Sequence, residues 1–205
     1  MRHFNLKSFF SILTVSLLGL SLTSCNTDDN ETTPVLIDPT EKADLLFILE
    51  EEKMARDVYS HLFDLYGSNQ FDNIKSSEQR HMNYVQGLLD TRNIEYEILA
   101  AGSFNNKEIQ NLYDQLISQG EIGLEDAFMV GATIEDVDIY DLQQIIERSS
   151  SSDIITVMEK LRCGSMNHMR AFTKGLDNLN ATYIPQYIRL EEYEDIVNGS
   201  NQHCG

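Results

Sequence analysis

The stretch LLFILEEEKMARDVYSHLFDLY, residues 45–66, decides the fold. Its apolar side chains recur every three or four positions, as they do along the buried face of an amphipathic helix. The stripe consists of Leu45, Ile48, Glu52, Ala55, Tyr59, Leu62 and Tyr66. Glu52 therefore lies in the middle of an apolar face, where a carboxylate without a partner is costly to bury. This helix requires a polar or cationic partner for one buried glutamate.

Three further amphipathic stretches have the same character, since polar residues interrupt each apolar stripe near its centre. The interrupting pairs are three residues apart and share a helix face: Glu78 with His81, Glu135 with Asp138, and Ser165 with His168. Strand-like alternation and repeats are absent from the sequence, which predicts an all-α fold. The main helices are expected at residues 41–66, 71–92, 121–148 and 152–179.

The connections between these helices predict their order in space. Gly67 and the serine run 149–152 mark short turns, so that the flanking helices form antiparallel pairs, and the serines offer helix N-caps. Residues 93–120 form a longer insertion with its own amphipathic piece, NKEIQNLYDQLISQ at 106–119. A long crossover carrying a short extra helix between helices two and three is typical of a ferritin-like four-helix bundle.

The N-terminus has the features of an export signal over residues 1–24. Arg2 and Lys7 precede an apolar run that is too short for an ordinary membrane span. The sequence LTS at 22–24, directly before Cys25, resembles the lipobox at which bacterial signal peptides are cut and the cysteine is acylated. We expect a lipid-anchored protein of the bacterial cell envelope that faces the periplasm or the exterior. The alternative is an uncleaved N-terminal anchor.

The rest of the chain suits one domain on a tether. The expected parts are a flexible tether at 25–40, the four-helix bundle at 41–179 and a tail at 180–205 packed on the bundle. The formal charge of −18 makes nucleic acid an improbable partner, because a polyanion repels phosphate backbones. The oligomeric state is open, with a homodimer among the alternatives.

Six polar residues at matched heights in the four stripes are expected to converge in the core. They are Glu52, Glu78, His81, Glu135, Asp138 and His168. Carboxylates and Glu-x-x-His pairs that project inward from facing helices are the pattern of di-iron and di-manganese bundles. The alternative is a buried polar network without a cation, which leaves net negative charge in a low dielectric. The pattern therefore favours a site for two metal ions.

Several motifs strengthen this hypothesis through a family resemblance. EKMARDVY at 52–59 and SEQRH at 77–81 resemble the first- and second-helix motifs of rubrerythrins. Together with VGATIEDVDIYDL at 130–142 and GSMNHMRAF at 164–172, they are similar to a ferritin-like family of uncharacterised proteins, domain of unknown function 2202. The resemblance implies that the ligands include Glu52, Glu78, His81, Glu135 and His168.

One position departs from the rubrerythrin pattern. Ser165 stands where rubrerythrins carry the glutamate of the fourth-helix Glu-x-x-His motif, and Asp138 is expected to replace that ligand. The edge near Ser165 is then open to water, peroxide or substrate. Tyr59 is expected to be a core residue, the alternative being that it donates a hydrogen bond to a ligand or itself relays an electron.

Carboxylate and imidazole ligands favour two iron ions, with manganese as the alternative. The expected function is reduction of peroxide or oxygen, with electrons from an external donor because the sequence has no CxxC pair. The alternatives are a lipoprotein that binds or scavenges metal without turnover, and a helical interaction module with a vestigial site. Cys163 and Cys204 are expected to form a disulfide after export, the alternative being two free thiols.

Overall fold

The structure is a computed structural model that describes residues 38–204 and contains only helices and loops in that range. The helices are α1 (Pro39–Tyr66), α2 (Asn69–Thr91), α3 (Lys107–Gly120), α4 (Leu124–Arg148), α5 (Ser152–Asn178) and α6 (Leu190–Asn198). The all-α prediction is confirmed. The predicted export signal, Cys25 and nearly all of the predicted tether lie outside the described residues. Among the described helices, none combines the length and apolar character that a membrane span requires.

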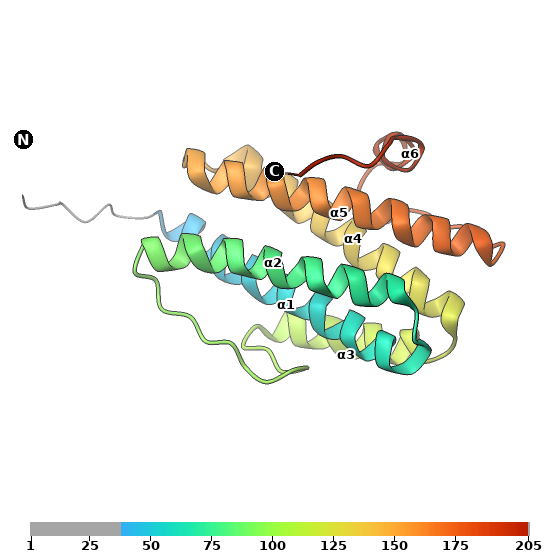
Figure 1. Cartoon of the computed structure of the whole chain (residues 1–205). Helices are drawn as coiled ribbons and strands as arrows, with labels where there is room; N and C mark the ends of the chain where they lie inside the picture. The colour runs from blue at the N-terminus through green and yellow to red at the C-terminus, as the bar shows by residue number, and fades with distance from the viewer. Residues whose placement is uncertain (1–37, 205) are drawn as a thin grey trace, which may run out of the picture. The chain divides into compact units, whose positions relative to one another are not determined.

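The four long helices pack as two pairs, α1 with α2 and α4 with α5 (Figure 1). The pairs meet where α1 contacts α4 and α2 contacts α5, and α3 lies against α1 and α4. The turn after α1 occupies two residues and the turn after α4 occupies three, whereas a long segment containing α3 joins α2 to α4. Each long helix is therefore packed on at least two of the others, and its inward face is closed to water.

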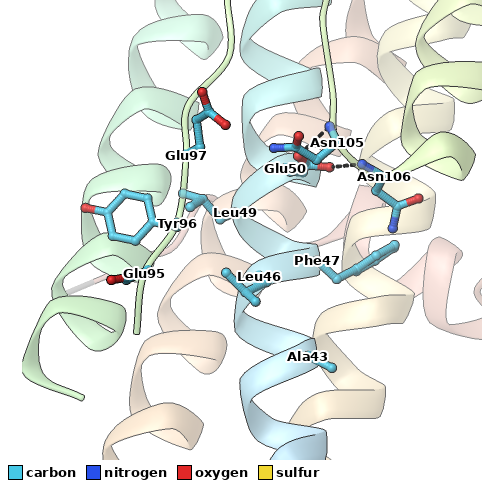
Figure 2. A pocket seen from close by; sticks show the side chains of 10 residues that line it. All are labelled: Ala43, Leu46, Phe47, Leu49, Glu50, Glu95, Tyr96, Glu97, Asn105 and Asn106. Carbon is cyan, nitrogen blue, oxygen red and sulfur yellow. Dashed lines mark hydrogen bonds between the residues drawn. The ribbon is translucent and has the colours of Figure 1, made fainter. Parts of the chain in front are cut away.

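The polar face of α1 holds the long connection between α2 and α3. The Lys53 ammonium is buried and donates to Asp57 at 2.7 Å and to the carbonyls of Ala100 and Ser103. Figure 2 shows Glu50 accepting hydrogen bonds from the backbone N–H groups of residues 105 and 106, at 2.8 and 2.7 Å. The pocket drawn there lies between α1 and this connection, and the predicted metal ligands are not among its lining residues.

The long helices begin within three residues of the predicted positions, with α2 starting at Asn69 rather than 71 and α4 at Leu124 rather than 121. α1 begins two residues earlier than predicted, because the Asp38 side chain accepts from the Thr40 N–H and Pro39 occupies the first turn. It ends at Gly67, whose φ of 65° favours glycine. Ser151 occupies the N-cap position of α5, as the serine run predicts, but its side chain makes no capping hydrogen bond. The hydroxyls of Ser149 and Ser151 donate instead to the Glu41 carboxylate, which joins the start of α1 to the α4–α5 turn.

The C-terminal residues include a helix that the sequence reading did not identify. α6 packs on α5, and the loop before α6 is fixed by the buried Asp136 of α4. This carboxylate accepts from the Tyr183 hydroxyl at 2.8 Å and from the backbone N–H groups of residues 186–188. A disulfide joins Cys163 of α5 to Cys204, with the Cα atoms 5.5 Å apart. Residues 180–204 are therefore attached to the helices at both ends.

The apolar core is divided into two clusters along the helices. One cluster contains Tyr59, Phe71, Phe128 and Phe172, and the other is built from aliphatic side chains at the opposite ends of the same helices. Gly131 allows the Phe172 ring to approach α4, since a Cβ at residue 131 would lie 2.4 Å from that ring. Along α1, α2 and α5, the polar residues of the stripes lie between members of the two clusters in sequence.

Candidate metal centre

The structure places four of the predicted ligands at the middle of α1, α2 and α4, almost completely removed from solvent. The exposed fractions of Glu52, Glu78 and Glu135 are 2%, 2% and 1%, and His81 is 5% exposed. His168 of α5 is 8% exposed. Two groups have ligand atoms within 4.8 Å of one another: Glu52, Glu78 and His81 form one, and Glu78, Glu135 and His168 form the other.

Glu78 connects the two groups. Its Oε2 atom lies 2.7 Å from Nδ1 of His81, and the same Nδ1 lies 3.1 Å from Oε2 of Glu52. On the other side, Oε1 of Glu78 lies 2.9 Å from Nδ1 of His168. Nδ1 of His168 is also 3.4 Å from Oε2 of Glu135. Nδ1 of each histidine thus lies close to two carboxylates, and Glu78 is the carboxylate that both histidines share.

Several buried atoms of the site have no hydrogen-bond partner among the described residues. They are Oε1 of Glu52, Oε1 of Glu78, Oδ1 of Asp138 and Nδ1 of His168. The 2.9 Å approach of His168 to Glu78 is therefore a close ion pair without the angle of a hydrogen bond. Buried polar atoms normally have a partner, so such atoms in one place call for an explanation. Carboxylate oxygens and imidazole nitrogens together suit a divalent transition-metal ion, and the donor set fits one.

The ionisation of the metal-free site follows from burial and close charges. Burial raises the pKa of Glu52 to about 7, although His81 opposes the shift. Burial also disfavours the charged forms of Glu78 and His168, but their mutual attraction is stronger. The pKa of Glu78 is accordingly lowered, and that of His168 is raised to about 10. Protons on the imidazoles balance the carboxylates until a cation replaces them.

Tyr59 and Ser165 each donate to a carboxylate in the site. The Tyr59 hydroxyl lies 2.5 Å from Oε1 of Glu135, and burial followed by the Glu135 charge raises the pKa of this phenol well above its usual value. The Ser165 hydroxyl donates to Oδ2 of Asp138 and lies 3.0 Å from the Leu161 carbonyl. Asp138 is buried beside Ser165 but belongs to neither three-residue group.

Glu51, the neighbour of Glu52 on α1, is buried although it does not belong to the apolar stripe. The stripe directs Glu52 inward and predicts that Glu51 points elsewhere, yet Glu51 is only 1% exposed and both of its carboxylate oxygens lack a partner. Burial, followed by the charges of Asp138 and Asp141, raises its pKa well above the usual value. The error has a physical cause: α1 contacts α2, α3 and α4, so more than one of its faces is buried. The only sequence feature that could have indicated this is the run of three consecutive glutamates at 50–52.

The fold and the site define a class: an all-helical protein whose long helices surround buried glutamate and histidine groups that could bind a metal ion. Residues 41–200 match the model of the family described as an uncharacterized protein domain, DUF2202, and the chain belongs to that family. It is 44% identical over 168 residues to the uncharacterized protein MJ0754 of Methanocaldococcus jannaschii, covering 81% of this chain and 91% of that protein.

A solved structure is similar over the same extent. The crystal structure of hypothetical protein MJ0754 from Methanococcus jannaschii superposes with a TM-score of 0.80 and 44% identity, and the match covers 81% of this chain and 96% of that chain. The shared architecture supports the arrangement of the helices that carry the site.

Proposed function

We propose that this chain binds two metal ions, preferably iron and alternatively manganese, at the glutamate and histidine groups. Glu52 and His81 would hold one ion, Glu135 and His168 the other, and Glu78 would be shared. The observation that carries the proposal is the pair of histidines that both direct Nδ1 at Glu78, with buried carboxylate oxygens left unpaired. Asp138 is the additional carboxylate, in the place of the glutamate that Ser165 replaces.

We further propose that the four long helices form a ferritin-like four-helix bundle related to that of rubrerythrins. The support is the pairing of α1 with α2 and of α4 with α5, joined by the long connection that contains α3. The support also includes Glu78 and His81, which are three residues apart on one helix as in di-iron bundles.

We propose that the bound metal serves to reduce peroxide or oxygen, with metal binding or scavenging without turnover as the alternative. Iron, when bound, would supply the exchange of electrons with such a substrate. The chain's own residues hold Glu135 in place through the Tyr59 hydroxyl, and hold Asp138 through Ser165. The three cysteines of the sequence cannot form a CxxC pair, so electrons would come from an external donor.

Metal analysis tests the proposal directly. The purified full-length chain is loaded anaerobically with Fe²⁺, desalted and analysed, and about two ions per chain are expected. Glu52→Gln and Glu78→Gln should each lose metal, while Glu159→Gln, on the exposed side of α5, should not. Wild-type chain that retains less than one ion contradicts the metal centre. Iron that is retained without accelerated peroxide or oxygen consumption favours the alternative of a metal-binding or scavenging protein.

We also propose that the chain is exported and lipid-anchored through Cys25, on the support of the charged start, the apolar run and the LTS sequence before that cysteine. Labelled fatty acid should be incorporated into the wild-type chain. Equal labelling and equal membrane association of Cys25→Ser would refute the anchor.

A further inference from the structure

A polar pocket of about 340 Å³ lies on the outer side of the two histidines, between α2, α5 and the C-terminal residues. His81 and His168 are part of its wall, together with Arg80, Lys160 and His203. None of its lining residues carries a carboxylate, although the chain has 33 acidic residues against 15 lysines and arginines. The electrostatic character of this pocket is therefore opposite to that of the whole molecule.

The histidine rings present their second nitrogens on the side away from the carboxylates. Because Nδ1 of each ring faces Glu78, Nε2 lies at the opposite edge of the ring. Gly164 lies against that edge of His81, since a Cβ at residue 164 would be 2.6 Å from Nε2. The rings of His81 and His168 are 5.6 Å apart and inclined by only 27°. Their outer edges therefore lie near each other.

Metal ligation at Nδ1 leaves the proton of the neutral ring on Nε2. Histidines that bind metals almost always donate this second N–H to a carboxylate, a carbonyl or water, which fixes the orientation of the ring. Within residues 38–204, neither Nε2 atom has a hydrogen-bond acceptor from the protein. An acceptor for these N–H groups would have to come from the pocket.

We propose that this pocket binds a small oxyanion, which accepts hydrogen bonds from Nε2 of His81 and His168 and pairs with Lys160 and Arg80. The inference rests on the proposed metal centre, because metal binding at Nδ1 makes both Nε2 groups donors. A carboxylate and a phosphate share the chemistry required, namely several acceptor oxygens and a negative charge.

Side-chain contacts, hydrogen bonds and a disulfide hold the residues around the pocket in place. Nζ of Lys160 lies 4.1 Å from the centre of the Tyr84 ring. The Asn167 side chain bonds both the carbonyl and the N–H of Gln202, at 3.0 Å each. The disulfide to Cys204 then fixes the chain next to His203. A preformed pocket lowers the entropic cost of binding a small ligand.

The carboxylates of the metal centre lie on the Nδ1 side of the two histidine rings, and their negative charge repels an anion in the pocket. Two divalent cations would offset the charges of Glu52, Glu78 and Glu135, so the metal-loaded chain should bind an oxyanion at least as tightly as the metal-free chain. The pocket and the centre would then be occupied together.

Calorimetric titration of the full-length chain tests the inference, with inorganic phosphate and acetate as separate probes. The chain is titrated metal-free and after loading with Mn²⁺, with metal content measured on the same samples. Lys160→Gln and Arg80→Gln should each weaken binding by roughly tenfold, which is 1.4 kcal/mol. Lys174→Gln, on α5 but outside this pocket, is the matched control and should bind as wild type does.

The possible results separate this inference from the proposed function. Two retained manganese ions without phosphate or acetate binding overturn the inference and leave the metal centre standing. Anion binding that depends on Lys160 without retained metal refutes the centre and overturns the donor role that the inference gives to the two metal-bound histidines. If Lys174→Gln weakens anion binding as much as Lys160→Gln does, the anion responds to the overall charge of the chain rather than to this pocket, and the inference is overturned. Absence of binding in both the metal-free and the metal-loaded chain also overturns it.

Discussion

Gly164→Ala is the smallest change that tests the position of His81. Gly164 lies on α5, and its missing Cβ leaves room for the imidazole from α2. An alanine methyl would be 2.6 Å from Nε2 and 2.8 Å from Cε1 of His81. Heavy atoms that are not bonded pack at roughly 3.5 Å, so the ring would have to move by about 0.9 Å. That distance exceeds the roughly 0.5 Å within which a functional site must be held.

The expected effects on stability and on metal affinity differ. Replacing glycine by alanine within a helix adds about 1 kcal/mol of stability, and overpacking a filled site removes about 1 to 3 kcal/mol. The free energy of unfolding of the metal-free chain should therefore fall by no more than about 2 kcal/mol. Displacement of a ligand and its contacts should weaken the ion at Glu52 and His81 by roughly 10- to 100-fold.

Gly87→Ala is the matched control, because Gly87 is exposed on α2 and a Cβ there would meet no atom within 4 Å. Urea denaturation gives the free energy of unfolding, and titration with Mn²⁺ gives the two affinities. The control should gain about 0.5 to 1 kcal/mol and keep both ions. If Gly164→Ala binds two ions with wild-type affinity, then His81 is not a ligand in the position described.

Three further predictions concern charge and cross-linking. The metal-free chain should lose stability as the pH rises from about 5 to 10. Glu52 and His168 bind protons more tightly in the folded chain, where their pKa values are about 7 and about 10, against 4.5 and 6.5 in the unfolded chain. The stability that this proton binding contributes is therefore lost across that pH range. Urea midpoints that rise with pH instead would contradict these raised pKa values. Glu51→Gln should raise the free energy of unfolding of the metal-free chain by about 1 kcal/mol or more, because it removes a buried carboxyl group that lacks a partner. The metal content of this variant should be unchanged. Lower stability in urea would show that Glu51 has a stabilising role. Removal of the disulfide by a Cys163→Ser/Cys204→Ser double variant should cost about 2 to 4 kcal/mol, since the cross-link spans 41 residues, and an unchanged urea midpoint would count against the cross-link.

The candidate ligands could be predicted from the sequence because helical periodicity indicates which face of a helix is buried. Glu52, Glu78 and His81 interrupt stripes that are otherwise apolar, and the structure brings these three together within 4.8 Å. The same reasoning located Glu135 and His168, which join Glu78 in the second group. Periodicity succeeds here because each of these residues projects from the face that meets the other long helices.

The other buried charged residues and the pocket depend on contacts that helical periodicity cannot predict. Lys53 is buried because it bonds the connection before α3, whereas Glu51 is buried near Asp138 and Asp141 of α4. Asp136 is next to Glu135 in sequence but anchors the loop at 183–188, some fifty residues later. The pocket outside the histidines requires the C-terminal residues to return to α5. Each of these features depends on contacts between residues that are far apart in the sequence.

If Ser165 stands in the place of the fourth-helix glutamate of rubrerythrins, as the resemblance implies, the proposed site has a carboxylate on α4 in place of one on α5. α4 supplies two carboxylates, Glu135 and Asp138, whereas α5 supplies only His168 and a hydroxyl. The Ser165 hydroxyl donates to one oxygen of Asp138 and leaves Oδ1 buried without a partner. Because aspartate has a shorter side chain than glutamate and its second oxygen is engaged, Asp138 can offer at most one oxygen freely. The two proposed metal positions would therefore be inequivalent: Glu78 of α2 belongs to both three-residue groups, whereas α5 offers no carboxylate to share between them.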